Sequence, residues 1–156
     1  MVGVLGIVII FPFVLPLILL LMLVSRIQAQ QFGRRYAAFL AQHEGIEFFC
    51  YTNRANSQFF VEEQILPVLD PQVHIIQLQG RKANSAFDEA YVSHMLHNID
   101  QVGFPVVMKI VNGRVLDRSL HDELYCIINQ KRDPTLLVQA IEDRLTQLRG
   151  LAGEGV

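Results

Sequence analysis

The chain opens with a long apolar run, and this run constrains the fold more than any other feature of the sequence. The first 25 residues contain no charged side chain, and between Val2 and Val24 nothing more polar than glycine or proline interrupts the large apolar side chains. A helix rises about 1.5 Å per residue, so about 20 apolar residues cross the roughly 30 Å of hydrocarbon in a bilayer. Residues 1–25 therefore predict one transmembrane helix in contact with the lipid bilayer.

A secretory signal peptide is the competing interpretation of this run. Such a peptide carries lysine or arginine ahead of an apolar region of about 7–15 residues. The run here is longer, and no basic side chain precedes it. An uncleaved anchor is therefore the prediction, and Pro12 and Pro16 are expected to bend it, as membrane spans tolerate.

Basic residues flank the run on one side only. Arg26, Arg34 and Arg35 follow it, whereas only the terminal amine precedes it. Lysine and arginine close to a span tend to stay in the cytoplasm. The sequence therefore predicts a single-pass protein of the cell (inner) membrane, with its N-terminus outside and its C-terminal domain in the cytoplasm.

The remaining residues, 26–156, are enough for one compact domain and not for two. The 13 basic and 15 acidic side chains are mixed along the chain, which argues against the basic stripe that nucleic acid needs. Cys50 and Cys126 are too few for a zinc framework, and a reducing cytoplasm disfavours a disulfide between them. We therefore predict no nucleic-acid partner and no cofactor.

One histidine pair is a candidate metal site. His94, His97 and Asp100 share one side of a predicted helix at a spacing of three residues, so a metal pair is geometrically allowed. No third ligand stands at a diagnostic spacing, and His97 points away from the apolar stripe of that helix. Two histidines on a solvated face are the commoner case, so no metal is predicted.

Hydrophobic periodicity divides the rest of the chain into a juxtamembrane helix over residues 26–44, an α/β domain over residues 45–149 and a flexible, glycine-containing tail over residues 150–156. The clearest local signal is Asn112-Gly113, which supplies the positive backbone angles of a tight hairpin turn. The expected strands are residues 46–52, 73–78, 106–111 and 114–116.

Helical patterns separate these strands. A first helix is expected from a cap at Asn56 or Ser57 to about Leu66, and a second over Ser85–Ile99. A last helix begins at Pro134 behind the cap Asp133 and carries a core-facing stripe through Leu148. The segment Ser119–Asn129 suits either a helix or a strand.

The order of these elements resembles that of a thioredoxin-like domain over roughly residues 45–149. Val107–Val115 is similar to the hairpin of that family, and Gly103-Phe104-Pro105 stands where the family places its cis-proline. The resemblance implies a mixed four-stranded sheet flanked by helices. Glu47–Ser57 is similar to the strand and turn that carry the family's Cys-x-x-Cys, and Asn53 and Asn56 then fall on the two cysteine positions.

These two amides decide most of the functional prediction. Thiol–disulfide exchange needs a thiolate of lowered pKa and a second thiol that resolves the mixed disulfide, and an amide supplies neither. Cys50 lies in mid-strand between Phe49 and Tyr51, where a free cysteine usually acts as a small buried apolar residue. No catalytic residue is therefore predicted.

Phe104 and Pro105 form the remaining candidate site. In the family the residue before the cis-proline lends its backbone to an extended partner chain, so the resemblance implies a peptide-binding edge beside Asn53 and Asn56. The alternative is that the proline only shapes the turn.

The function expected from the sequence is a non-catalytic, membrane-anchored accessory or assembly subunit. Its partners would be other subunits of a larger membrane protein complex. A respiratory or photosynthetic energy-converting complex is one candidate. Two alternatives stay open: a membrane-tethered thiol redox protein or chaperone that uses Cys50, alone or with Cys126, and a holdase that binds peptides at the Phe104–Pro105 edge.

Overall fold

A computed structural model describes the backbone of residues 2–100 and 103–153 and the side chains of residues 15–100 and 103–151. The chain divides into two compact units, Met1–Ala38 and Phe39–Val156. Each unit is described by itself.

The first unit consists of helix α1, which spans Val2–Gln42 and extends with its last turn into the second unit. Pro12 and Pro16 lie inside α1 without ending it. Among the described residues, Leu15–Gln42 is the one helical segment long and apolar enough to cross a membrane, with a mean hydropathy of 1.4 in its most apolar window. None of that window is buried within the protein. One apolar N-terminal helix could thus span a bilayer, on the grounds of length and composition.

The second unit is an α/β domain built on a mixed sheet in the order β3-β2-β1-β4-β5. The strands are β1 (Glu47–Thr52), β2 (His74–Gln79), β3 (Lys82–Asn84), β4 (Val106–Val111) and β5 (Arg114–Ser119). Strands β1 and β2 are parallel, and every other neighbouring pair is antiparallel. The predicted hairpin is confirmed, because Asn112 and Gly113 have φ values of 52° and 69° between β4 and β5.

The sheet has five strands, so the prediction of a four-stranded sheet was wrong. The additional strand is β3, which pairs with β2 through Gln79 and Lys82. Gly80 allows the tight two-residue turn between these strands, because it adopts a φ of 65°, which glycine reaches without steric cost. Only three residues follow in the strand, too few for a period-two pattern to be recognised in the sequence.

The helices are α2 (Ala55–Phe60), α3 (Glu89–His97), α4 (His121–Gln130) and α5 (Thr135–Gly153). A π-helical turn, Val61–Ile65, and a 3-10 turn, Leu66–Val68, continue α2. The segment Ser119–Asn129, for which the sequence allowed a helix or a strand, is helical from His121 and forms most of α4. Helix α5 runs past Gly150, where the tail was expected to begin, and residues 154–156 of that tail lie outside the described residues.

Two predicted helix starts were wrong. Helix α2 begins behind Arg54 as its N-cap, because the Ser57 hydroxyl bonds back to the Arg54 carbonyl instead of capping a later start. Helix α3 begins four residues after Ser85, because the Asp88 carboxylate accepts a hydrogen bond from the Ala90 amide at 2.9 Å and caps the helix there.

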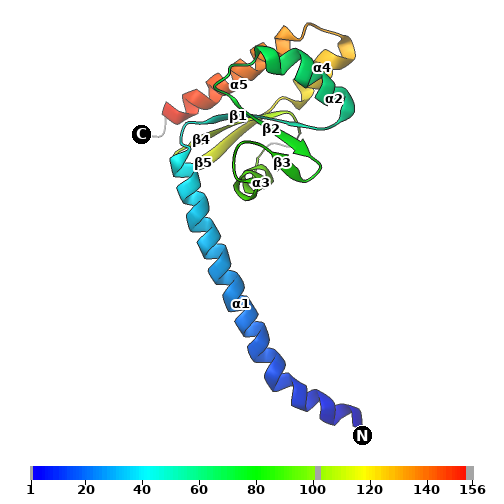
Figure 1. The fold of residues 1–156 in the computed structure, drawn as a ribbon, viewed down its shortest axis with the longest axis vertical. Coiled ribbons are helices and arrows are strands. Elements are labelled where there is room, and N and C mark those ends of the chain that lie inside the picture. Colours follow the sequence, from blue (N-terminus) through cyan, green and yellow to red (C-terminus); the bar gives the residue numbers. More distant parts are fainter. Residues whose placement is uncertain (1, 101–102, 154–156) are drawn as a thin grey trace. The chain divides into compact units, whose positions relative to one another are not determined.

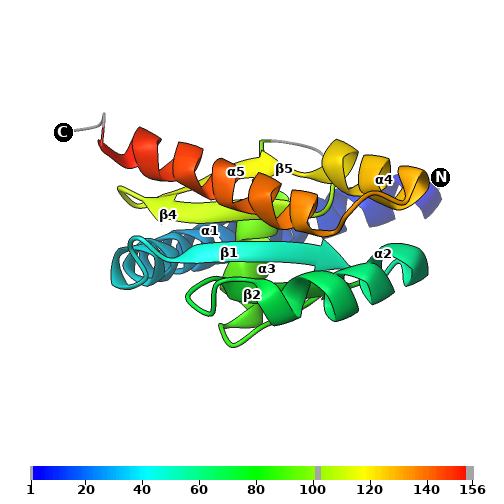
Figure 2. The ribbon, with the colours of Figure 1, turned by 90° about the horizontal axis from the view of Figure 1, so that it is seen from above.

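Two helical layers enclose the sheet. Helices α2, α4 and α5 lie on one face and α3 lies on the other, as Figures 1 and 2 show. Side chains alternate between faces along a strand, so Phe49 and Tyr51 of β1 face the α2–α4–α5 layer while Phe48 and Cys50 face the opposite side. The larger core cluster lies on the first face, and its members include Phe49, Tyr51, Val61, Ile65, Val107, Leu124, Ile127, Leu137, Ile141 and Leu145.

Candidate functional site

The turn that follows β1 and the segment that precedes β4 lie at the same end of the sheet. In the antiparallel register Cys50 of β1 is opposite Val106 of β4, so the chain beyond Cys50 runs toward the chain before Val106. Asn53 and Asn56 are exposed, and the backbone N–H of Asn53 donates a hydrogen bond to the Leu78 carbonyl at 2.9 Å. The register thus brings the chain that follows β1 and the chain that precedes β4 to the same end of the sheet.

The segment Gly103–Pro105 already has hydrogen-bond donors on all three of its carbonyl groups. The Ser119 hydroxyl donates to the Gly103 carbonyl at 3.2 Å, and the Leu120 amide donates to the Pro105 carbonyl at 2.8 Å. The ring Nδ1 of His121 lies 3.1 Å from the Phe104 carbonyl; because a carbonyl only accepts, this nitrogen donates. The Phe104–Pro105 peptide is cis.

His121 is a site residue that the sequence analysis missed. It lies at the start of α4, and it also packs against Gly103, where a Cβ atom would come within 2.9 Å of the His121 Cβ. An extended partner chain at Phe104 would have to share the Phe104 carbonyl with His121. No motif in the sequence signals this contact, because the two residues meet only when α4 folds back beside the segment before β4.

Cys50 is fully buried, with 0% of its surface exposed, in the strand that lies between β2 and β4. Burial raises the pKa of this thiol far above its ordinary value. A buried thiol of raised pKa holds little of the thiolate that attacks disulfides or electrophiles. The predicted structural position of Cys50 thus comes with a chemical consequence, which is low reactivity.

Cys126 lies on the other side of the sheet from Cys50. It belongs to α4, whose Leu124 and Ile127 pack on the face that Phe49 shares, whereas Cys50 points to the opposite face. Cys126 is half-buried, and both cysteines are free. The two thiols therefore do not form the neighbouring pair that exchange chemistry requires.

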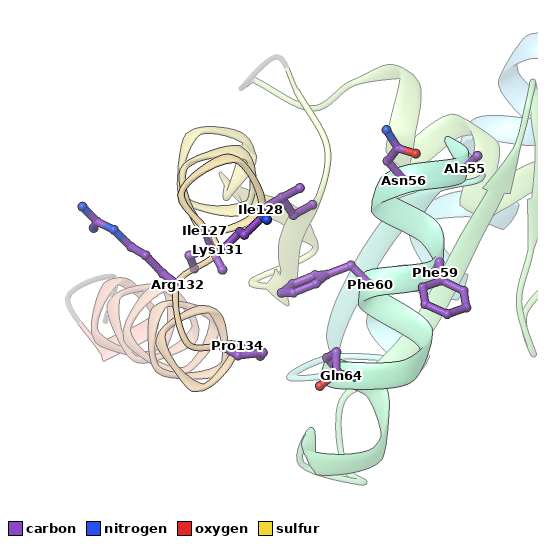
Figure 3. Close-up of a pocket in the computed structure, with 10 residues that line it drawn as sticks. All are labelled: Ala55, Asn56, Phe59, Phe60, Gln64, Ile127, Ile128, Lys131, Arg132 and Pro134. Atoms are coloured by element: carbon purple, nitrogen blue, oxygen red, sulfur yellow. The ribbon is translucent and has the colours of Figure 1, made fainter.

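An apolar groove lies beside Asn56, between α2 and the junction of α4 with α5. We name it the α2–α4 groove; Figure 3 shows its lining residues, which are Ala55, Asn56, Phe59, Phe60, Gln64, Ile127, Ile128, Lys131, Arg132 and Pro134. Its volume is about 700 Å³. The ring of Phe60 points from α2 toward the α4–α5 junction (Figure 3). This groove is not recognisable in the sequence, because its walls come from residues about 70 positions apart.

The remaining candidates do not assemble into a metal centre. His94 and His97 lie in the last turn of α3, and the Asp100 amide donates a hydrogen bond to the Asp117 carboxylate at 2.9 Å. Within residues 2–100 and 103–153, no three His, Cys, Asp or Glu residues come together closely enough to hold a metal ion.

A charged cluster occupies the opposite end of β1. Glu47, its first residue, accepts hydrogen bonds from Lys109 at 2.7 Å and from Arg149 at 2.6 and 2.8 Å. The Arg149 guanidinium, together with the Lys109 ammonium, holds the pKa of the Glu47 carboxyl below its usual value. The cluster joins the last helix to two strands, and every charged atom of Glu47 has a partner, so we assign it a structural role.

Comparisons of the chain with family models, with curated proteins and with solved structures found no match.

Proposed function

We propose that this protein is a membrane-anchored, thioredoxin-like interaction domain without thiol chemistry, and that it serves as an accessory or assembly subunit of a larger membrane complex. One observation carries the proposal. The exposed residues of the turn after β1 are 53–56; they include the amides Asn53 and Asn56 and no thiol, while Cys50 is buried with a raised pKa. The domain thus presents a surface at this end of the sheet and no nucleophile.

The arrangement of elements supports the thioredoxin-like part of the proposal. A parallel β1–α2–β2 unit is followed by α3 and by the antiparallel hairpin β4–β5, and Pro105 directly precedes β4. Strand β3 extends this arrangement at the sheet edge beyond β2. In this interpretation the fold has kept its peptide-facing corner and exchanged its thiols for amides.

Installing the thiols tests this interpretation. The double variant Asn53→Cys/Asn56→Cys is expected to gain insulin disulfide reductase activity with a dithiol as the electron donor, because the new thiols would stand where exchange chemistry needs them. The matched control is Asn53→Ser/Asn56→Ser, which is expected to stay inactive like the wild type. A double-cysteine variant without activity would count against the thioredoxin-like placement of this turn.

The alternative of a thiol redox protein has its own test. Wild-type protein that reduces insulin, with activity abolished by Cys50→Ser, would establish the redox function and overturn the non-catalytic proposal. The holdase alternative predicts that Phe104→Asp abolishes client binding while the protein stays in its complex. The His121 ring already occupies one acceptor position of the Phe104 carbonyl, so a client strand would have to share that carbonyl with it.

The membrane part of the proposal places the N-terminus outside and the domain in the cytoplasm. It rests on the exposed apolar side chains of α1, which include Leu15, Leu19 and Leu23, and on the arginines that follow them. Protease added to sealed cells or spheroplasts is expected to leave the domain intact. Degradation of the domain by external protease would show that the orientation is the opposite one.

The assembly role fits a tethered domain whose exposed turn after β1 carries amides in place of thiols. Anchoring both partners in one membrane raises their effective concentration, so that even a weak contact can hold a subunit in place. The test is extraction in a mild detergent, followed by measurement of native size and mass analysis of the co-purifying subunits. Recovery as a lone monomer would contradict the assembly role.

A further inference from the structure

The α2–α4 groove has apolar walls that the described residues of the second unit leave partly uncovered. Phe59 is 65% exposed, the highest value among the large apolar side chains described in the second unit. Its neighbour Phe60 is half-buried and points across the groove toward the side of Ile128 and Pro134 (Figure 3). Apolar surface concentrated in one concave place is typical of a site where a partner binds.

The charge at the groove is one-sided. Two of its ten lining residues, Lys131 and Arg132, are basic and exposed, and none is acidic, although the chain as a whole has a net charge of −2. Within the described residues neither of these two side chains forms an ion pair. Lys131 lies beside Ile128 at the groove and Arg132 points away from α2 (Figure 3). The nearest acid along the chain, Asp133, is engaged by the Thr135 amide at 2.9 Å.

The backbone of the two basic residues forms a defined turn at this junction. Lys131 adopts a left-handed conformation with a φ of 49°, an unusual one for a residue other than glycine, and ends α4 there. The Arg132 amide donates a hydrogen bond to the Ile127 carbonyl at 3.0 Å. The positive charge is thus attached to a defined turn at the rim of an apolar groove.

The dimensions of the groove fit a helix. The wall from Ala55 to Gln64 is about 13 Å long at a rise of about 1.5 Å per residue, and two turns of a bound helix need about 11 Å. The groove walls are themselves helical and use their backbone amides internally, so strand addition has no free edge here. A lipid chain needs a site that encloses most of its surface, and the exposure of Phe59 shows that this groove is open.

From these observations we propose that the α2–α4 groove binds an amphipathic helix of a partner protein, with apolar side chains at helical spacing and acidic side chains next to them. The apolar face of that helix would cover Phe59 and Phe60, and its carboxylates would meet Lys131 and Arg132. This inference rests on the proposed function, because it identifies the surface through which the domain joins its complex.

Site-specific photo-cross-linking in the native membrane tests the inference. p-Benzoylphenylalanine is introduced in place of Phe59 in the full chain, and a matched control carries it in place of Val68, which is 62% exposed and outside the groove lining. The expected result is a protein adduct at position 59 and none above background at position 68. Peptide mapping is expected to place the adduct in a helical segment with acidic residues beside an apolar stripe.

Charge reversal provides the second measurement. Lys131→Glu combined with Arg132→Glu is expected to lower the yield of the position-59 adduct about fivefold, since exposed ion pairs contribute modestly. Continued protection of Cys50 from alkylation shows that the variant is folded. Four results would each overturn the inference. Two concern the adduct: it contains lipid, or it maps to a basic or extended protein segment. The other two concern its yield: it is equal at positions 59 and 68, or charge reversal leaves it unchanged.

The native size of the complex separates this inference from the proposed function. A complex that persists while position 59 gives no specific adduct overturns the groove and leaves the assembly role standing. A monomer in mild detergent overturns the assembly role itself.

Discussion

The charged cluster at Glu47 allows a quantitative prediction about what holds the domain together. Glu47 and Lys109 are directly opposite on β1 and β4, and their side chains are only 11% and 13% exposed. Arg149 reaches the same carboxylate from α5 and is 43% exposed. The cluster thus connects residues 102 positions apart, and most of it is shielded from water.

Glu47→Gln keeps the shape of the side chain and removes its charge. Removing one partner of a fully buried pair costs about 3–5 kcal/mol, whereas an exposed pair contributes about 0–1 kcal/mol. Since Lys109 is mostly buried and Arg149 is free to turn toward water, we expect Glu47→Gln to lower the free energy of unfolding by about 2 kcal/mol. Lys109→Met should cost a similar amount, and the double variant should cost about 1 kcal/mol less than the sum.

The pH dependence follows from the lowered pKa of Glu47 in the folded state. Because this pKa is below the value in the unfolded chain, about 4.3, the stabilisation is fully present above that pH and disappears as the pH falls through the folded-state pKa. The difference between wild type and Glu47→Gln should therefore be constant from pH 7 to about pH 5 and shrink below about pH 4.

The assay is urea unfolding of the full chain in detergent, followed by the near-ultraviolet circular dichroism of its tyrosines. A loss below about 0.5 kcal/mol at neutral pH, or a difference that stays the same down to pH 3, would refute the assignment of this cluster as a largely buried ion pair.

Two further experiments test the site, one by alkylation and one by substitution. In the folded protein Cys126 is expected to react with an alkylating reagent and Cys50 to stay protected, so that mass spectrometry finds one adduct per chain before unfolding and two after; rapid labelling of Cys50 would contradict its burial. Gly103→Ala is expected to lower stability by about 2–4 kcal/mol, measured from the urea midpoint, because φ is 116° at this position and the new Cβ would meet His121. His121→Ala should not rescue it, since alanine keeps the Cβ that is in contact; an unchanged midpoint for Gly103→Ala would show that the segment before β4 yields more easily than its geometry indicates.

Elements that depend on local signals were predictable from the sequence. The Asn112-Gly113 turn fixed the β4–β5 hairpin, and Asp133 accepts a hydrogen bond from the Thr135 amide at the start of α5. Both features involve residues within a few positions of one another, where backbone preference decides the outcome. The apolar run of α1 belongs to the same class, because length and composition alone make it long enough to span a membrane.

Features that depend on distant contacts were not predictable. Strand β3 exists because it pairs with β2, and its three residues carry no pattern of their own. The contact of His121 with Gly103 likewise forms only after the sheet and α4 have come together.

The number of cysteines says nothing of how far apart they lie, whereas the sheet determines the position of Cys50 relative to Cys126. From the sequence, Cys50 and Cys126 are two thiols that a fold is free to bring together. In the structure, the alternation along β1 sends Cys50 to the α3 face while α4 carries Cys126 on the other, so the sheet lies between the two sulfur atoms. Any thiol chemistry would then have to proceed from Cys126 alone, without a resolving partner in the same chain. The α2–α4 groove lies on the face of the sheet opposite to Cys50. It is the surface at which we propose that a partner binds.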